Sequence, residues 1–124
     1  MINVIKLDNY NFEGPYLLST FEGLNRAAIY AILCKNIFSN DFKIIYIGQS
    51  GEYGARLDTH NKKYCWDDNC KAGILYVAIF YTPTDQYSKK EREKLEGELI
   101  SKFNPVCNEK NKNNLLETIK SVIK

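Results

Sequence analysis

The sequence predicts an α+β domain in which a small, mainly antiparallel three-stranded sheet is flanked by helices. Three short runs at 27–34, 43–48 and 74–81 are rich in apolar, β-branched and aromatic residues, as strands are. Ser88 followed three residues later by Glu91 is a capping-box sequence, which indicates the start of a long helix. With 124 residues, the chain is expected to form one domain, 1–124.

The first half of the chain is expected to supply a hairpin. Residues 2–7 read as a short strand, and residues 9–15, with Asn, Gly and Pro, read as a turn-rich connection. The strands at 27–34 and 43–48 are separated by a turn-like Ser-Asn-Asp sequence. These two strands should therefore pair antiparallel.

The second half is expected to alternate helix and strand. A helix over 55–63 would follow a glycine-containing loop, and the third strand would occupy 74–81. The capped helix should run over 88–103 and end before Pro105. A last amphipathic helix is expected over 115–123.

Composition places few limits on function. Apolar residues make up 44% of the chain and charged residues 26%, as in ordinary globular domains. Seventeen Lys and Arg against fifteen Asp and Glu leave a net charge of +2, so overall charge does not indicate nucleic-acid binding. The basic residues of the second half form either a basic face or a merely solvated surface.

The apolar runs are too short to span a bilayer, and the apolar start is too short for a signal peptide. We therefore expect a cytoplasmic protein with no membrane contact. The four cysteines lack paired zinc-module spacing, so reduced thiols are expected. A zinc module would require Cys65 and Cys70 to meet Cys34 or Cys107 in space.

The helix over 88–103 contains an anomalous carboxylate. Its apolar face consists of Leu95, Leu99, Ile100 and Phe103. At about 100° per residue, Glu96 falls within that face, whereas Glu98 falls on the opposite side. A carboxylate facing inward is costly unless it is paired or bound to a metal. Glu96 is thus a candidate metal ligand, and a partly exposed glutamate at a helix edge is the alternative.

Two further pairs of side chains are candidates. Arg56 and His60 would lie one turn apart on the 55–63 helix, where Arg suits phosphate and His can position water. Surface residues of these types are, however, usually only solvated. Tyr30 and Tyr46 lie in the two paired strands, so their hydroxyls could approach each other, although cross-strand packing is the ordinary explanation.

The order and spacing of these residues resemble the GIY-YIG nuclease family. The first signature reads Ala28-Ile29-Tyr30, with alanine for the usual glycine, and the second reads Tyr46-Ile47-Gly48 without change. Arg56 follows Tyr46 by ten positions, and His60 comes one turn later. Glu96 precedes Asn108 by twelve positions, with Leu-Ile and Pro between them.

The resemblance covers a motif core at 27–108, and residues 1–26 form an N-terminal extension outside it. The segment between the two signatures is longer than is usual in the family. The resemblance implies hydrolysis of DNA phosphodiester bonds, leaving 5′-phosphate and 3′-hydroxyl ends. It also implies that target specificity comes from a second copy of the chain or from a partner protein, unless specificity is relaxed.

The resemblance assigns a role to each candidate. Glu96 would hold Mg²⁺ or Mn²⁺, and Arg56 would offset charge developing on the phosphorus. Tyr30 or His60 would handle the proton of the attacking water. Tyr46 would hydrogen-bond near the phosphate, and Asn108 would hold the site in register. The alternative is a catalytically inactive DNA-binding or scaffolding module of the same fold, which the alanine in the first signature favours.

Overall fold

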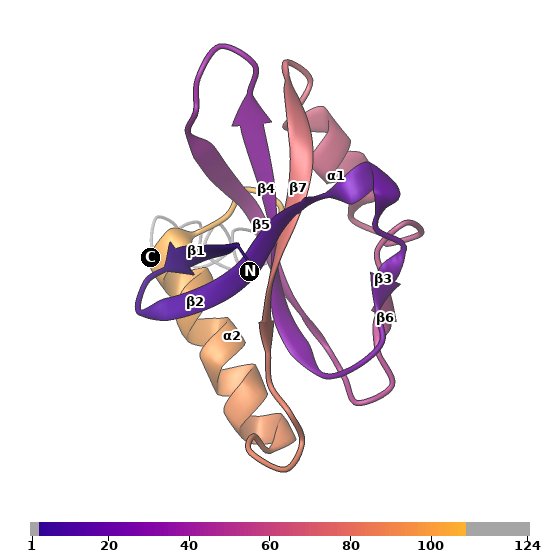
Figure 1. Cartoon of the computed structure of the whole chain (residues 1–124), viewed down its shortest axis with the longest axis vertical. Coiled ribbons are helices and arrows are strands. Elements are labelled where there is room, and N and C mark those ends of the chain that lie inside the picture. The colour runs from indigo at the N-terminus through magenta and orange to yellow at the C-terminus, as the bar shows by residue number, and fades with distance from the viewer. Residues whose placement is uncertain (1–2, 109–124) are drawn as a thin grey trace, which may run out of the picture.

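The computed structural model describes residues 3–108, and their fold is mostly β. A five-stranded antiparallel sheet has the order β1-β2-β7-β4-β5, and a separate two-stranded sheet pairs β3 with β6 (Figure 1). The large sheet consists of β1 (Val4–Leu7), β2 (Tyr10–Leu17), β4 (Ala28–Asn36), β5 (Phe42–Ser50) and β7 (Gly73–Tyr81). The small sheet consists of β3 (Gly23–Leu24) and β6 (Ala55–Arg56).

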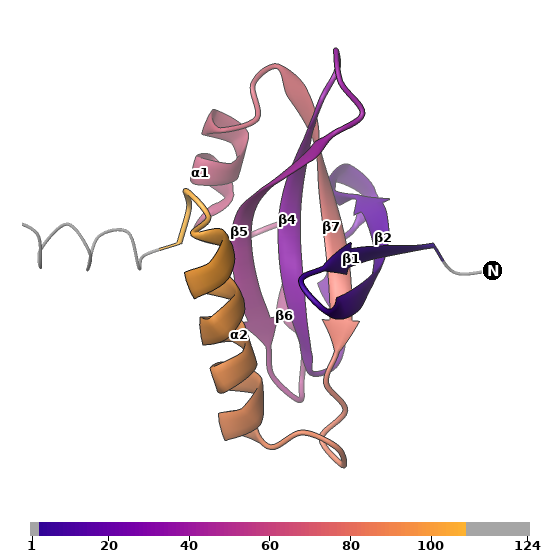
Figure 2. The same cartoon turned by 90° about the vertical axis from the view of Figure 1, so that its left-hand side faces the viewer.

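Two α-helices lie in this part of the chain, α1 (Lys63–Asp68) and α2 (Lys89–Phe103). A short 3-10 helix, η1 (Leu18–Thr20), follows β2. In Figure 2 both α-helices lie on the side of the sheet where β5 is the edge strand, and β1 and β2 lie on the other side. The helix expected over 115–123 lies outside the described residues.

The predicted three-stranded sheet flanked by helices, as in GIY-YIG nucleases, is wrong. All three predicted strands form, as β4, β5 and β7, but β1 and β2 extend the sheet to five. Residues 9–15 were expected to be a turn and lie mostly in β2. The turn is instead confined to Asp8 and Asn9, between the pair Leu7 and Tyr10.

Glycine and proline misled the prediction for β2 because they mark an irregularity inside a strand. Gly14 has a φ of 109°, and the register with β7 shifts between Glu13 and Tyr16. A bulge of this kind accommodates both residues without ending the strand. Phe12, fully buried, anchors β2 to the sheet.

The predicted helix over 55–63 is also wrong. Ala55 and Arg56 form β6 and pair with Leu24 and Gly23. The backbone N–H of Leu57 then donates to Glu22 O at 2.8 Å. Pairing with a segment distant in sequence therefore replaces helix formation, and Arg56 and His60 do not share a helix face.

The helix α2 begins and ends as predicted. The Ser88 side chain accepts from the Glu91 backbone N–H, and the Glu91 side chain accepts from Ser88 N–H, which completes the capping box. Asn104 ends the helix in the left-handed conformation, with a φ of 45°, just before Pro105. The capping box thus satisfies backbone N–H groups at the start of the helix, and the turn at Asn104 satisfies a backbone carbonyl at its end.

The large sheet has an apolar cluster on each face, because successive side chains of a strand point to opposite sides. One cluster joins Leu95 and Leu99 of α2 to Ile29, Ala31 and Leu33 of β4. The other contains Tyr30 and Ile32 of β4 together with Leu57 and Trp66.

Two disulfides replace the expected reduced thiols. Cys34 pairs with Cys70, and Cys65 pairs with Cys107. The cysteines that a zinc module would have brought together are thus joined in disulfides. Within residues 3–108, no helix is long and apolar enough to cross a membrane.

Candidate functional site

A pocket of about 310 Å³ opens beside β5, near α2 and the segment before α1. Its lining comprises Tyr46, Ile47, His60, Asn61, Lys62, Glu96, Ile100 and Asn108. Four of the six residues selected from the sequence are among them: Tyr46, His60, Glu96 and Asn108. Residues from four separate segments thus converge on one concave site.

Tyr30 lies behind the pocket wall and is only 2% exposed. Its ring centroid lies 6.1 Å from that of Tyr46 and 6.5 Å from that of His60. Burial raises the pKa of Tyr30 strongly, and Tyr46 and Glu96 raise it further. Tyr30 is therefore a neutral phenol at physiological pH and is poorly suited to remove a proton from water.

His60 belongs to an aromatic group that closes one side of the pocket. Its ring lies 5.3 Å from that of Tyr46 and 4.8 Å from that of Trp66. The Lys62 backbone N–H donates to His60 Nδ1 at 2.9 Å. Burial, followed by the charge of Lys62, lowers the pKa of His60, so its imidazole is neutral at pH 7 and carries its proton on Nε2.

Arg56 does not reach the pocket. Its Nε and one terminal nitrogen donate to Asp58 at 3.0 and 2.6 Å, and its side chain is 64% exposed. This hydrogen bonding and charge hold the pKa of the Asp58 carboxyl below its usual range. Of the described residues that line the pocket, Lys62 carries the positive charge.

Glu96 lines the pocket and is half-buried, whereas Glu98 is exposed. Gln49 Nε2 donates to Glu96 Oε1 at 3.2 Å, and Arg92 Nε donates to Gln49 Oε1 at 2.8 Å. Burial raises the pKa of Glu96, whereas the hydrogen bond from Gln49 opposes that rise. The carboxylate is therefore held by a second layer of polar groups.

Sequence reasoning missed four polar residues at or behind the pocket: Gln49, Asn61, Lys62 and Arg92. Two of them carried a usable signal. Arg92 precedes Glu96 by one helical turn, so both lie on one helix face. Gln49 directly follows the second signature, at the end of the strand. Asn61 and Lys62 were hidden by the mistaken helix over 55–63.

Asn108 completes the edge of β5. Its Nδ2 donates to Ile47 O at 2.7 Å, and its Oδ1 accepts from Ile47 N–H at 3.0 Å. The Cys107 N–H donates to Ile45 O at 2.9 Å. Since β5 is an edge strand, these contacts satisfy backbone groups that would otherwise be left open.

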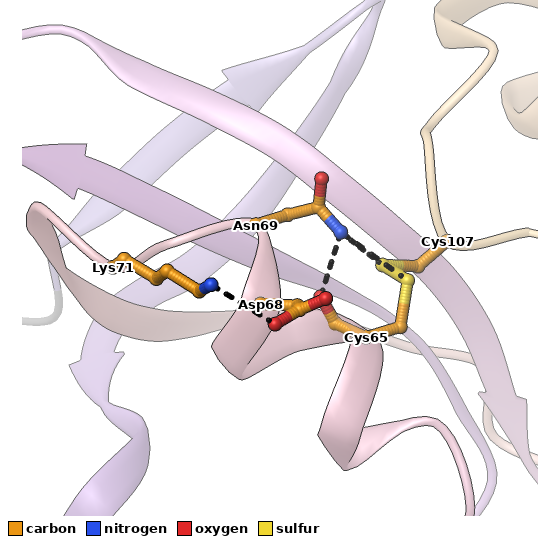
Figure 3. A network of polar contacts seen from close by, with 5 residues as sticks. All are labelled: Cys65, Asp68, Asn69, Lys71 and Cys107. Atoms are coloured by element: carbon orange, nitrogen blue, oxygen red, sulfur yellow. Dashed lines mark hydrogen bonds and ion pairs between the residues drawn. A yellow bond between two sulfur atoms is a disulfide. The ribbon is translucent and has the colours of Figure 1, made fainter.

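The disulfide of Cys107 anchors this closing segment to α1 (Figure 3). The Asn69 side-chain nitrogen donates to Cys65 O at 2.8 Å and lies 3.6 Å from Cys107 Sγ. Nearby, Lys71 and Asp68 form an exposed ion pair. The helix α1, the Cys65–Cys107 disulfide and the Asn108 amide together hold the side of the pocket that Asn108 lines.

The lining of the pocket includes one carboxylate, that of Glu96. Among the residues described, no group of three or more His, Cys, Asp or Glu side chains gathers as a metal site. Mg²⁺ is commonly held by one or two carboxylates, with waters and substrate phosphate completing its shell.

Comparisons with known proteins add no relative. The chain matches no protein-family model, and no curated sequence or solved structure shows significant similarity to it.

Proposed function

We propose that this chain is a divalent-metal-dependent endonuclease that hydrolyses DNA phosphodiester bonds. The observation that carries the proposal is the convergence of Tyr46, His60, Glu96 and Asn108 on one pocket. In the sequence these residues follow the order of the GIY-YIG signature. The proposal rests on these residues and not on a likeness of fold.

Glu96 is the metal ligand in this proposal. Bound Mg²⁺ or Mn²⁺ would polarise the phosphate and stabilise charge on the leaving 3′ oxygen. Lys62, which lines the pocket, binds a nonbridging phosphate oxygen, a role that the sequence had suggested for Arg56. Arg56 contributes only if it leaves Asp58 when DNA binds.

The proton chemistry follows from the states of the aromatic residues. His60 donates a hydrogen bond from Nε2, because its Nδ1 already accepts one from the backbone. Tyr30 holds the ring of Tyr46 in place from behind the pocket wall. Tyr46, on the wall itself, is the phenol that contacts the substrate or the attacking water.

Cleavage of supercoiled plasmid tests the proposal. Wild type with Mg²⁺ or Mn²⁺ should nick the plasmid, EDTA should stop the reaction, and Glu96→Gln should lower the rate at least about 100-fold. Glu98→Gln is the matched control, since it makes the same change two residues away on the exposed face. Metal-independent cleavage, or equal rates for the two variants, would reject the assignment of Glu96.

One observation favours a second candidate, a DNA-binding or scaffolding module without catalysis. The phosphate-binding arginine that the sequence suggested is held by Asp58 outside the pocket. Retarded migration of DNA in a gel, without cleavage by the wild type under any metal condition, would support this module instead.

The partners and the compartment belong to the same proposal. DNA is the substrate, and a second copy of the chain or a partner protein supplies target specificity. The sequence suggested the cytoplasm, but two disulfides are typical of an oxidising compartment. Thiol labelling of protein taken from its native host distinguishes the two, since full labelling of the cysteines supports the cytoplasm.

A further inference from the structure

A buried arginine lies behind the candidate metal ligand. Arg92 is only 6% exposed, and arginine is rarely buried unless its charge is paired or hydrogen-bonded. Its Nε donates to Gln49 Oε1 at 2.8 Å. Neither residue lines the pocket, and the chemistry proposed above does not use them.

Gln49 connects this arginine to Glu96. Its Nε2 donates to Glu96 Oε1 at 3.2 Å. A carboxamide has an acceptor at one end and a donor at the other, whereas a guanidinium only donates and a carboxylate only accepts. The chemistry of the two neighbours therefore fixes the direction in which the Gln49 amide points.

The Gln49 amide lies between Arg92 and Glu96, which could otherwise pair directly. Arg92 and Glu96 are four residues apart on α2, a spacing at which an arginine can fork directly onto both oxygens of a carboxylate. Gln49 instead joins the two side chains and engages Oε1. The positive charge stays behind the carboxylate, and Glu96 still faces the pocket.

We propose that Arg92 and Gln49 are positioning residues that fix the Glu96 carboxylate in the orientation that binds a divalent cation. This proposal rests on the proposed function, in which Glu96 holds the metal. Second-layer hydrogen bonds of this kind orient metal ligands, and their loss commonly weakens metal binding about 10- to 100-fold.

The geometry of this chain of hydrogen bonds supports the proposal. Gln49 holds one oxygen of the Glu96 carboxylate, and Arg92 holds Gln49 from the buried side. The other charged or titratable groups around the pocket are Tyr30, Tyr46, His60 and Lys62.

Calorimetric titration with Mn²⁺ alone tests this. Arg92→Met and Gln49→Leu should each weaken Mn²⁺ binding about 10-fold or more. Arg92→Lys should recover part of the loss, because it restores a cationic donor to Gln49. Lys94→Met, on an exposed position of the same helix, should bind as wild type does.

Each result bears on a definite claim. If wild type binds Mn²⁺ and Glu96→Gln does not, but Arg92→Met and Gln49→Leu bind normally, the positioning role is wrong and the proposed function stands. If Glu96→Gln binds as tightly as wild type, both fail. A loss in Arg92→Met that Arg92→Lys does not rescue assigns Arg92 a structural role only. Should Arg92→Met not fold, Gln49→Leu decides by its Mn²⁺ affinity.

Discussion

Burial sets the protonation states around the pocket, residue by residue. It raises the pKa of Tyr30 and of Glu96 and lowers that of His60, so each group is driven toward its neutral form. For Tyr30 and His60 the neutral form suits packing and hydrogen bonding. For Glu96 the neutral form would oppose the proposed metal binding, and an ionised Glu96 comes at some expense of stability.

Replacing Glu96 should therefore stabilise the metal-free protein. The folded-state pKa of Glu96 lies above its ordinary value of 4.5, so wild type loses stability as pH rises from below that value through the folded pKa. Gln cannot titrate and still accepts from Gln49. In EDTA, urea unfolding should show Glu96→Gln gaining stability over wild type at about pH 8 and losing that gain at about pH 4.

The exposed Glu98→Gln variant is the control and should follow wild type at both pH values. A Glu96→Gln variant that is less stable than wild type at the higher pH would show that the carboxylate is not strained by its surroundings. Addition of Mg²⁺ should stabilise wild type but not Glu96→Gln.

At the scale of elements, local sequence patterns predicted α2 and the strands β4, β5 and β7, but they missed β2 and β6. The capping box predicted the start of α2, and its helical pattern placed Glu96 among the inward-facing positions. The segment over 55–63 has helical residues too, but its pairing with Gly23 and Leu24 could not be read from a local pattern. Gln49 and Lys62 were missed for the same reason, since their roles depend on distant segments.

The contact between β4 and β5 requires a residue without a side chain at position 48. A Cβ on Gly48 would lie 2.6 Å from the Tyr30 hydroxyl and 2.8 Å from the Tyr46 ring. Gly48→Ala should therefore displace both rings and lower the free energy of unfolding by about 1–3 kcal/mol. Urea unfolding measures the change in stability, and plasmid cleavage should fall with it.

Gly51→Ala is the matched control, because apart from residue 51 and its chain neighbours no heavy atom lies within 4 Å of the added Cβ. It should leave both stability and cleavage nearly unchanged. Equal behaviour of the two variants would mean that the tyrosines do not depend on Gly48 for their positions.

At the scale of the whole molecule, two disulfides join segments that are distant in sequence: one ties β4 to the segment after α1, and the other ties α1 to the segment after α2. They close loops with sequence separations of 36 and 42 residues. In the chain-entropy account each stabilises the fold by about 4 kcal/mol, and the two differ by only about 0.1 kcal/mol. Any difference between them in activity must then come from their positions.

Removing the bonds one at a time should separate stability from function. Cys34→Ala with Cys70→Ala and Cys65→Ala with Cys107→Ala should each lower the free energy of unfolding by about 2–5 kcal/mol. Below the unfolding transition, only the second pair should slow plasmid cleavage, since Cys107 adjoins Asn108. Equal cleavage by both double variants would show that the Cys65–Cys107 bond does not support the pocket.

The bond between Asn108 and Ile47 has a consequence for hydrogen exchange. An amide on the outer side of an edge strand normally exchanges with solvent within moments, but the Ile47 N–H is held by a side chain 61 residues away. Its exchange rate therefore measures how often the closing segment lifts from β5. One amide resonance followed in heavy water would thus report the opening of the pocket wall in the resting protein, with neither DNA nor metal present.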